Sequence, residues 1–380
     1  MNILVVNAGS TTVKFKLFDG SLSEKLKGII DKKADTTEIK LEKEGHEYKW
    51  EDAQGYENAA LIIIKEVGGD IDKIGFRVVH GGEKFIQPVK ITAEIISKIK
   101  ELTRLAPLHN PPALKVINDF KQQLPGKDMF AVFDTAFHAD IPKHAAIYAI
   151  PYKYYEENQI RRYGFHGTSH KYVSGIFREL EPKTGKLISC HLGGGASITA
   201  VKDGKSIDTS MGFTPLEGLV MASRSGDIDA GVILHLQIQM QMDADAVSTL
   251  LNKQSGLLGL SGSTSDMRKL LELEAGGDKP AKLAIAVYIY RIQKYIGAYA
   301  AAMNGVDGLL FTAGVGQGSD VIRERICSNL GYLNIKIDPK LNTGKYNVSE
   351  NLKLNDKNSI PVWVIPTNEE LQIAKEIYKL

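Results

Sequence analysis

The chain has 380 residues, of which 43% are hydrophobic and 24% are charged, and its formal net charge is +2. This length predicts two domains with sizeable cores in a soluble globular protein. The lysines are scattered among acidic residues. The sequence therefore predicts neither a basic face for nucleic acid nor a field that attracts an anionic membrane.

The cysteines and the apolar stretches favour a cytoplasmic protein. Cys190 and Cys327 are too few for a disulfide framework and lack zinc-site spacing. The N-terminus, MNILVVNAGS, lacks the basic and apolar regions of a signal peptide. Residues 284–303 form the most apolar long stretch, but Arg291 and Lys294 interrupt it, which predicts a buried helix and not a membrane span.

The first elements read as strands. Residues 3–6 are a short apolar run, and in residues 13–17 apolar side chains alternate with lysines, as in a half-buried strand. Strand-like and helix-like patterns then alternate along the chain. This alternation predicts an α/β architecture.

Two helices are predicted from their capping signals. In HNPPALKVINDFKQQL, Asn110 is expected to cap a helix that has Pro111 at its first position. In the C-terminal PTNEELQIAKEIYKL, a capping box from Thr367 to Glu370 is expected to open the last helix.

The chain contains one internal sequence similarity. VNAGSTTVKFKLFDG (6–20) aligns without gaps with CHLGGGASITAVKDG (190–204), and both follow an apolar run and end in Asp-Gly. Two such hairpins predict two related halves. The alternative is a chance similarity, because Asp-Gly is a common hairpin turn.

Three runs of small residues are candidate phosphate sites: 7–14, 191–195 and 308–327. Small residues let the backbone approach a ligand closely, and their N–H groups can bind phosphate oxygens. The third run predicts a strand that enters Gly-rich turns before a helix, whose N-terminus favours anions. No P-loop motif is present, so a nucleotide site must use other loops.

The third run also permits a different class of protein. GVGQGS resembles a dinucleotide fingerprint, and Asp338 follows at about the expected distance. That pattern would make the protein an NAD enzyme. Too little chain follows the run for a full doubly wound sheet, which argues against this alternative.

Motifs along nearly the whole chain carry a family resemblance. They are, in order, NAGSTTVKF, RVVHGGE, LAPLHNPP, FDTAFH, YGFHGTSH, HLGGGAS, DTSMGFTPLEG, SRSGDID, SDMR, FTAGVGQGS and PTNEE. In this order they resemble the acetate kinase family. YGFHGTSH with DTSMGFTPLEG is specific to the acetate and propionate kinases.

The resemblance implies an α/β fold of two duplicated actin-like (ribonuclease H-like) domains with the active site in the cleft between them. The implied domains are 1–140 with 370–380, and 141–369. The implied reaction is acetate + ATP ⇌ acetyl phosphate + ADP, with Mg²⁺ as cofactor and Mn²⁺ as a substitute. The family also implies a homodimer.

The resemblance implies roles for individual residues. Arg77 would bind the substrate carboxylate, and Arg224 would bind the transferring phosphoryl group. His166 would stabilise the transition state, and Asp134 would be the essential acidic residue. Further implied acyl-site residues are Val79, Leu108, His109, Phe165 and Pro215.

The nucleotide and metal sites are implied in the same way. The implied metal site is Asn7 and Glu369, acting through water. The implied nucleotide-binding residues are Ser10, Thr12, Lys14, His191, Leu192, Gly193, Gly194, Gly195, Asp266, Met267, Arg268, Gly314, Val315, Gly316, Gln317 and Gly318.

The chemistry of this reaction agrees with such a set of residues. A carboxylate has a pKa of about 4 and is already ionised at neutral pH, so no general base has to activate it. The reaction needs in-line alignment and neutralisation of crowded negative charge, which two arginines, a histidine and Mg²⁺ provide. We therefore expect Asp134 to orient an arginine or a metal-bound water.

Simpler structural explanations exist for several of these residues. Without the family, Arg77 reads as a strand-end surface arginine, and His109 can simply lock a Pro-rich turn. His166 and His170 lie four residues apart, but the intervening Gly167 and the missing HExxH pattern argue against zinc.

Other side chains have an ordinary helical or surface explanation. His170 is expected to cap or pack. Asp266 and Arg268 can form an ordinary surface pair. Capping would occupy Glu370, which leaves Glu369 for the metal.

Two departures from the family pattern touch the phosphoryl-donor side. Gly194 stands where the family usually has Asn, and the family's GIGEN is here GVGQG (314–318). Pyrophosphate therefore stays an alternative donor, although the retained Asp266, Arg268 and Gly314 favour ATP. Propionate or another short-chain acid is the alternative acceptor. A non-catalytic actin-fold nucleotide-binding protein is the alternative from a different class.

Overall fold

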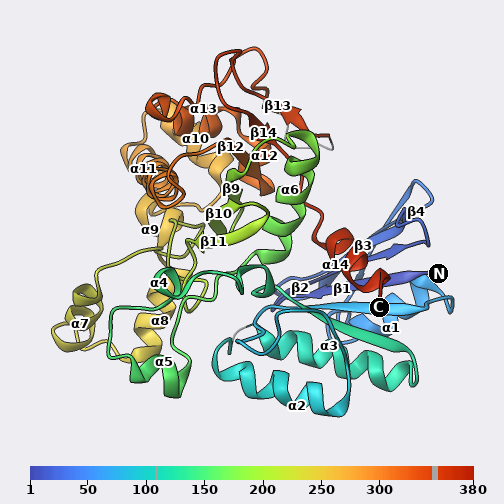
Figure 1. Cartoon of the computed structure of the whole chain (residues 1–380). Helices are drawn as coiled ribbons and strands as arrows, with labels where there is room; N and C mark the ends of the chain where they lie inside the picture. The colour runs from blue at the N-terminus through green and yellow to red at the C-terminus, as the bar shows by residue number, and fades with distance from the viewer. Residues whose placement is uncertain (108, 345–349) are drawn as a thin grey trace. The chain divides into compact units, whose positions relative to one another are not determined.

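The computed structural model describes residues 1–107, 109–344 and 350–380. The chain forms two compact units (Figure 1). The first unit comprises Met1–Ala139, Gly167–Ser169 and Asn368–Leu380, and the second comprises Asp140–His166 and His170–Thr367. The predicted Leu108 lies outside the described residues.

The first unit is built on an eight-stranded sheet of order β5-β4-β3-β2-β1-β6-β8-β7. Its strands are β1 (Ile3–Ala8), β2 (Thr12–Phe18), β3 (Glu24–Lys32), β4 (Thr37–Lys43), β5 (His46–Asp52), β6 (Lys73–Val78), β7 (Val89–Lys90) and β8 (Asp128–Phe133). The central strands β1, β6 and β8 are parallel, and the other neighbours pair antiparallel.

Helices cover both faces of this central sheet. They are α1 (Ala59–Val67), α2 (Ala93–Glu101), α3 (Asn110–Gln123) and α14 (Glu369–Tyr378), with short 3₁₀ turns at Leu102–Arg104 and Ala136–His138. Ile373 and Ile377 of α14 pack against Val5 on one face. Phe120 of α3 contacts Phe76 edge-on, with ring centroids 5.4 Å apart. Because Phe76 follows Gly75, which meets α14, these two helices lie on opposite faces (Figure 1).

The second unit is built on a six-stranded sheet of order β11-β10-β9-β12-β14-β13. Its strands are β9 (Lys186–Leu192), β10 (Ala196–Lys202), β11 (Lys205–Thr209), β12 (Gly308–Thr312), β13 (Leu352–Lys353) and β14 (Val362–Val364). Its helices are α4 (Lys143–Ala146), α5 (Lys153–Asn158), α6 (Gly167–Leu180), α7 (Ala230–Ile238), α8 (Ala244–Lys253), α9 (Gly256–Ser261), α10 (Met267–Ala275), α11 (Lys279–Ala302), α12 (Ala313–Gly318) and α13 (Asp320–Cys327), with a 3₁₀ turn at Gly331–Leu333. The first three residues of α6 belong to the first unit.

The two sheets confirm the duplication predicted from the similarity between the hairpin segments 6–20 and 190–204. The order β3-β2-β1-β6-β8-β7 in one sheet matches β11-β10-β9-β12-β14-β13 in the other. The parallel and antiparallel pairings also agree along both sheets. The first sheet differs by the added strands β4 and β5 on one edge. The two similar segments lie in the equivalent hairpins β1–β2 and β9–β10.

Several local predictions are confirmed. The alternating segment 13–17 is strand β2, with its apolar side chains buried and its lysines more exposed. The apolar stretch 284–303 lies within α11 except for its last residue, and one side of that helix is buried. No helix among the described residues combines the length and the apolarity needed to cross a membrane.

The two predicted capping signals are wrong. His109, not Asn110, precedes α3. Asn110 is fully buried, and its side chain exchanges hydrogen bonds with the backbone N–H and carbonyl of His80. At α14 the cap is Asn368, whose side chain accepts a hydrogen bond from the Leu371 N–H. In both cases a tertiary contact or a nearer cap competes with the sequence signal.

The expected Gly-rich turns at 313–318 are also wrong. These residues form the short helix α12 immediately after β12, and α13 follows. Arg323 of α13 is fully buried and donates to the carbonyls of Gly316 and Gln317. This side chain satisfies backbone acceptors at the end of α12, which a glycine-rich segment alone would leave open.

Candidate functional site

One group of polar side chains lies at the carboxyl edge of the first sheet. Asn7 lies near the end of β1, Arg77 near the end of β6, and Asp134 follows β8 directly. These strands are parallel neighbours, so their carboxyl ends meet at the same edge. Ligands of α/β proteins bind at this edge of a sheet.

Arg77 is fixed by three oxygen-bearing side chains. It donates from Nη2 to Asp134 Oδ2 at 2.7 Å and from Nη1 to Asn7 Oδ1 at 3.3 Å. Its Nε lies 3.7 Å from Glu369 Oε2. Burial disfavours the charged form of Arg77, but Asp134, Glu369 and Glu370 outweigh burial and raise its pKa above the ordinary value. The guanidinium is thus a fixed cation, and the surface-arginine explanation is wrong.

Both carboxylate oxygens of Asp134 accept hydrogen bonds, and its side chain is fully buried. Besides Arg77, its Oδ1 accepts from the Thr168 N–H at 3.1 Å. Its carbonyl accepts from the Gly167 N–H at 3.0 Å. A Cβ on Gly167 would lie 2.1 Å from that carbonyl oxygen, so this approach requires glycine. Asp134 therefore orients the groups around it.

Carboxylates at the start of α14 adjoin this group. Glu370 does not cap the helix as expected, and its Oε1 accepts from Asn7 Nδ2 at 3.5 Å. Burial raises the pKa of Glu369 to about 7; Arg77 opposes the rise, and Asp134 and Glu370 add to it. Glu369 is also not free, because it pairs with Arg77.

This donor set fits Mg²⁺. All the donors are oxygens, which hard cations prefer, and a cation would offset the crowded negative charge that raises the pKa of Glu369. Among the described residues, no three His, Cys, Asp or Glu side chains are grouped to hold a metal by themselves. A cation here would keep several water ligands, as Mg²⁺ does.

The second unit gathers histidines where β9 ends and α6 begins. His166 has a left-handed backbone, with φ of 56°, and its ring stacks on His191 with centroids 4.2 Å apart. Its Nδ1 lies 2.9 Å from the Ser197 hydroxyl of β10. A Cβ on Gly195 would come within 3.3 Å of the His166 ring. The glycine turn therefore lets the β9–β10 loop lie against this ring.

Arg224 lies near the same turn. Its Nη1 would be 3.7 Å from a Cβ on Gly195, and it donates to the Pro215 carbonyl at 3.0 Å. Among the described residues no carboxylate pairs with Arg224. Burial lowers its pKa, because nothing nearby offsets the desolvated charge. An anion such as a phosphoryl group would supply that charge.

The proposed nucleotide residues have distinct environments. The turn 193–195 joins β9 to β10, and α12 packs against β9. A Cβ on Gly194 would meet nothing within 4 Å, so space does not explain the family's Asn being absent here. Asp266 caps α10 and pairs with Arg268 at 2.7 Å, which is the geometry of a surface ion pair. Met267, the residue between them, is buried.

The predicted acyl-pocket residues divide between the two units. Val79 and His109 belong to the first unit, and Phe165 and Pro215 belong to the second. Phe165 is buried. Leu108 lies outside the part of the chain that the structure describes.

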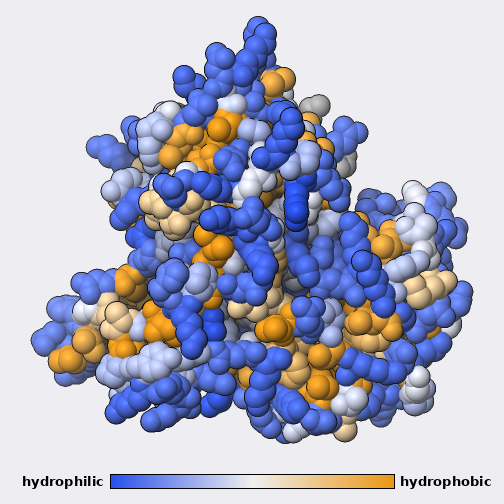
Figure 2. Space-filling view, in the orientation of Figure 1, coloured by the Kyte–Doolittle hydropathy of each residue, from blue (hydrophilic) through white to orange (hydrophobic). Residues whose placement is uncertain are grey.

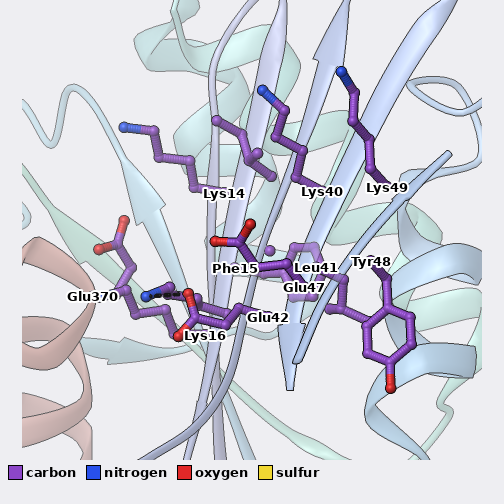
Figure 3. Close-up of a pocket in the computed structure, with 13 residues that line it drawn as sticks. Lys14, Phe15, Lys16, Lys40, Leu41, Glu42, Glu47, Tyr48, Lys49 and Glu370 are labelled. Atoms are coloured by element: carbon purple, nitrogen blue, oxygen red, sulfur yellow. Dashed lines mark ion pairs between the residues drawn. The ribbon is translucent and has the colours of Figure 1, made fainter. Parts of the chain in front are cut away.

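A row of lysines lies on the same sheet face as Asn7. The strand register aligns Asn7, Lys14, Ile29, Lys40 and Lys49 across β1 to β5. Figure 3 shows the three lysines extending to one side of a cavity of about 470 Å³. Glu38 binds both outer lysines, Lys40 and Lys49, at 2.7 Å. Lys14 pairs with no carboxylate among the described residues, so it is the cation of this row that is available to a phosphate.

Sequence reasoning missed several residues at these positions. Arg162 donates to the carbonyls of Thr209, Ser210 and Met211 and pairs with Glu217 at 2.6 Å. This clamp holds the segment that leads to Pro215. Ser197 contacts two histidines, and Glu370 contacts Asn7. Ser197 stands within the quoted motif HLGGGAS, where a hydroxyl in an apolar strand was the available signal.

Comparisons with known proteins decide the family. The family model described as the acetokinase family matches residues 2–375. The chain belongs to the acetokinase family. The acetate kinase of Thermosipho melanesiensis is 48% identical, with 99% of this chain and 97% of that protein covered.

Two solved structures of the same family agree. The Porphyromonas gingivalis acetate kinase superposes with a TM-score of 0.90 at 40% identity, covering 99% of this chain and 98% of that one. A Francisella tularensis propionate kinase superposes with a TM-score of 0.92 at 41% identity, with the same coverage. The resemblance and the duplicated actin-like fold predicted from the motifs are confirmed. The NAD-enzyme alternative is displaced by the acetokinase match.

Proposed function

We propose that this protein is an acetate kinase, which transfers the γ-phosphoryl group of ATP reversibly to acetate and forms acetyl phosphate and ADP. The observation that carries the proposal is the contrast between two partly buried arginines. Arg77 is locked in place by Asp134, and Arg224 pairs with no carboxylate among the described residues. Membership of the acetokinase family over residues 2–375 supports the assignment.

The proposed roles follow from charge. Acetate binds to Arg77 as a carboxylate, and one of its oxygens attacks the γ-phosphorus while the bond to the β,γ-bridging oxygen breaks. Arg224 neutralises charge on the equatorial oxygens of the transferring group, and the Nε2–H of His166 donates a hydrogen bond to one of them. Backbone N–H groups of the 193–195 turn bind the nucleotide phosphates. Asp134 removes no proton and keeps Arg77 in position.

We assign the metal to the oxygen donors at the carboxyl edge of the first sheet. Asn7 and Glu369 would hold Mg²⁺ through water, with Mn²⁺ as a substitute. When bound, the cation supplies neutralisation of phosphate charge. Lys14 extends from the same sheet face and contacts the phosphates in the proposed site.

Propionate is the second candidate acceptor. The 41% identical Francisella tularensis structure is that of a propionate kinase. One extra methylene changes the discrimination of an apolar pocket by only ~1–3 kcal/mol. Val79, Phe165 and Pro215 are the pocket residues we propose to set that preference.

We also propose a homodimer in the cytoplasm. Helix α7 has no buried residue, and Leu234, Ile238 and the following Met240 are each more than half exposed. Figure 2 shows hydrophobic atoms gathered on α7. A second copy of the chain is the partner that would cover this surface. The two free, buried cysteines, Cys190 and Cys327, agree with a reducing compartment.

The first test is acyl phosphate formation, trapped as the hydroxamate, from acetate with Mg²⁺ and ATP. Parallel reactions replace ATP by pyrophosphate and acetate by propionate. We expect the highest kcat/KM with ATP and acetate. Product only with pyrophosphate would reassign the donor, and higher kcat/KM with propionate would reassign the acceptor. No product in any reaction would leave a nucleotide-binding protein without the chemistry.

A further inference from the structure

A single hydroxyl joins two histidines in the second unit. Ser197 Oγ lies 2.9 Å from His166 Nδ1 and 2.8 Å from His170 Nε2. The other nitrogen of His170, Nδ1, lies 2.8 Å from Ser189 Oγ. Ser197, His170 and Ser189 are all fully buried. The contacts form a chain that runs from Ser189 through His170 and Ser197 to His166.

The proton count of this chain couples the two rings. A serine hydroxyl has one proton, so Ser197 can donate to only one histidine and must accept from the other. If Ser197 donates to His166 Nδ1, His170 Nε2 must carry a proton. The neutral His170 then has a bare Nδ1, which accepts from Ser189.

Ser189 decides between the two directions. Among the described residues its hydroxyl has one hydrogen-bonding contact, His170 Nδ1. If Ser189 accepted from His170, its own O–H would be a buried donor without an acceptor, which is costly. If Ser189 donates, both hydroxyl protons and the ring proton of His170 have acceptors. The second arrangement is therefore favoured.

We propose that Ser189, His170 and Ser197 are positioning residues that hold neutral His166 with Nδ1 bare and the proton on Nε2. This inference rests on the proposed function, in which His166 Nε2 donates to the transferring phosphoryl group. Each hydroxyl and ring donates towards His166, and such a chain of hydrogen bonds is mutually polarising. His166 can then donate to phosphoryl oxygen without first becoming a cation.

This role also explains why His170 is buried with both ring nitrogens occupied. The sequence suggested that it merely caps or packs. His166 directly precedes α6, and His170 lies one helical turn later, where it contacts Ser189 of β9 and Ser197 of β10. His166 contacts the same Ser197 hydroxyl through its Nδ1. The four-residue spacing of the histidines thus serves a shared serine and not a metal.

The decisive measurement is the tautomer of His166, read from imidazole nitrogen shifts of ¹⁵N-histidine protein at pH 8.5, where ordinary imidazole is neutral. His166→Gln assigns the signal. We expect a protonated Nε2 in the wild type and a mixture of tautomers in Ser197→Ala. A wild-type His166 with protonated Nδ1, or a tautomer unchanged in Ser197→Ala, would overturn the proposal. This readout needs no turnover, so it stands apart from a failure of the proposed activity.

Kinetics provide the second readout. Ser197→Ala should lower kcat by on the order of 10- to 100-fold, with KM for acetate and ATP changed less than about threefold, because a transition-state donor is misaligned while substrate binding remains. Ser197→Thr keeps the hydroxyl and should recover most of the rate. Thr199→Val is the matched control, since its buried hydroxyl on the same strand contacts Thr209 and, among the described residues, no histidine. Equal kcat values for Ser197→Ala and Thr199→Val would contradict the proposal.

Discussion

At the scale of single residues, the two arginines differ in how their shielded charge is balanced. Arg77 and Arg224 are both largely shielded from water. Arg77 has Asp134 as a partner, whereas among the described residues Arg224 contacts a carbonyl and a sulfur but no carboxylate. A buried cation with a carboxylate is a fixed element, whereas one without a carboxylate attracts an anionic ligand. The sequence predicted both arginines as site residues. The structure adds that a carboxylate balances the charge of Arg77 but not that of Arg224 among the described residues.

Asp134→Asn should lower kcat by on the order of 100-fold. The amide keeps the shape of the side chain but loses the charge that holds Arg77, and removing one partner of a buried pair costs about 3–5 kcal/mol. Steady-state kinetics with urea unfolding measures both effects. Asp128→Asn is the control, because Asp128 at the start of β8 forms a surface pair with Lys90 of β7. Near-normal turnover in Asp134→Asn would contradict the orienting role.

Lys14→Ala should raise the KM for ATP more than the KM for acetate. Lys14 is exposed on β2 and lacks a carboxylate partner among the described residues, so its charge is free to bind phosphate. Lys40→Ala is the control, because Lys40 belongs to the same row but is bound by Glu38. A larger rise in the KM for acetate would move Lys14 out of the donor site.

His80 should make stability fall with acidification. Burial, aided by His109, lowers the pKa of His80 from 6.5 to about 4. The unfolded chain therefore takes up a proton below pH 6.5 that the folded protein does not, so stability is full above pH 6.5 and falls towards pH 4. From pH 7.5 to pH 5 this histidine alone should remove about 2 kcal/mol from the free energy of unfolding.

Urea unfolding of His80→Gln at both pH values checks the effect. The difference between pH 7.5 and pH 5 should shrink in this variant by about that amount. The exposed His46→Gln serves as the control and should keep the wild-type difference. An unchanged difference in His80→Gln would show that His80 does not carry this dependence.

At the scale of elements, helix ends depend on neighbours more than on the local signal. Asn368 caps α14, so Glu370 is available to contact Asn7. Asn110 does not cap α3, because its side chain binds the backbone of His80. Helix α12 exists within a glycine-rich stretch because Arg323 binds its last carbonyls. Glycine disfavours helix by about 1 kcal/mol per residue, so this helix depends on tertiary support.

Arg323→Lys should weaken nucleotide binding through α12. The guanidinium also reaches Asn342 and the Thr343 carbonyl, and an ammonium cannot reproduce this fork. We expect a rise in the KM for ATP of roughly tenfold, about 1.4 kcal/mol, with the KM for acetate unchanged. Arg325→Lys, on the same helix and paired with Glu274 near the surface, is the control. Equal effects of the two variants would contradict this support role.

At the scale of the whole molecule, duplication explains the two-unit organisation. Both sheets use the same strand order and directions, and β4 and β5 extend the first one. The second unit instead carries α7, on which Leu234 and Ile238 remain more than half exposed in the part of the chain that the structure describes. The two units thus share a core of the same strand order. They differ in their surfaces, because β4 and β5 are added to the first unit and α7 to the second.

The double variant Leu234→Asp with Ile238→Asp should convert the proposed homodimer into a monomer. Charges on an apolar interface are desolvated without partners, which opposes association. Sedimentation velocity at matched concentration measures the mass. Leu61→Asp is the control, since Leu61 is a similarly exposed apolar residue on α1. A wild-type monomer, or a double variant that stays dimeric, would contradict α7 as the interface.

The class of fold, the duplication and the family could be predicted from the amino-acid sequence, because strand alternation, the paired hairpins and the ordered motifs are local patterns. The sequence placed Arg77, Asp134, His166 and Arg224 among the candidate site residues on the same local grounds. Contacts in the folded chain were needed to establish that Asp134 holds Arg77, that α12 is a helix and that Ser197 joins two histidines. These outcomes depend on burial and on contacts between residues distant in sequence, and no local pattern encodes either.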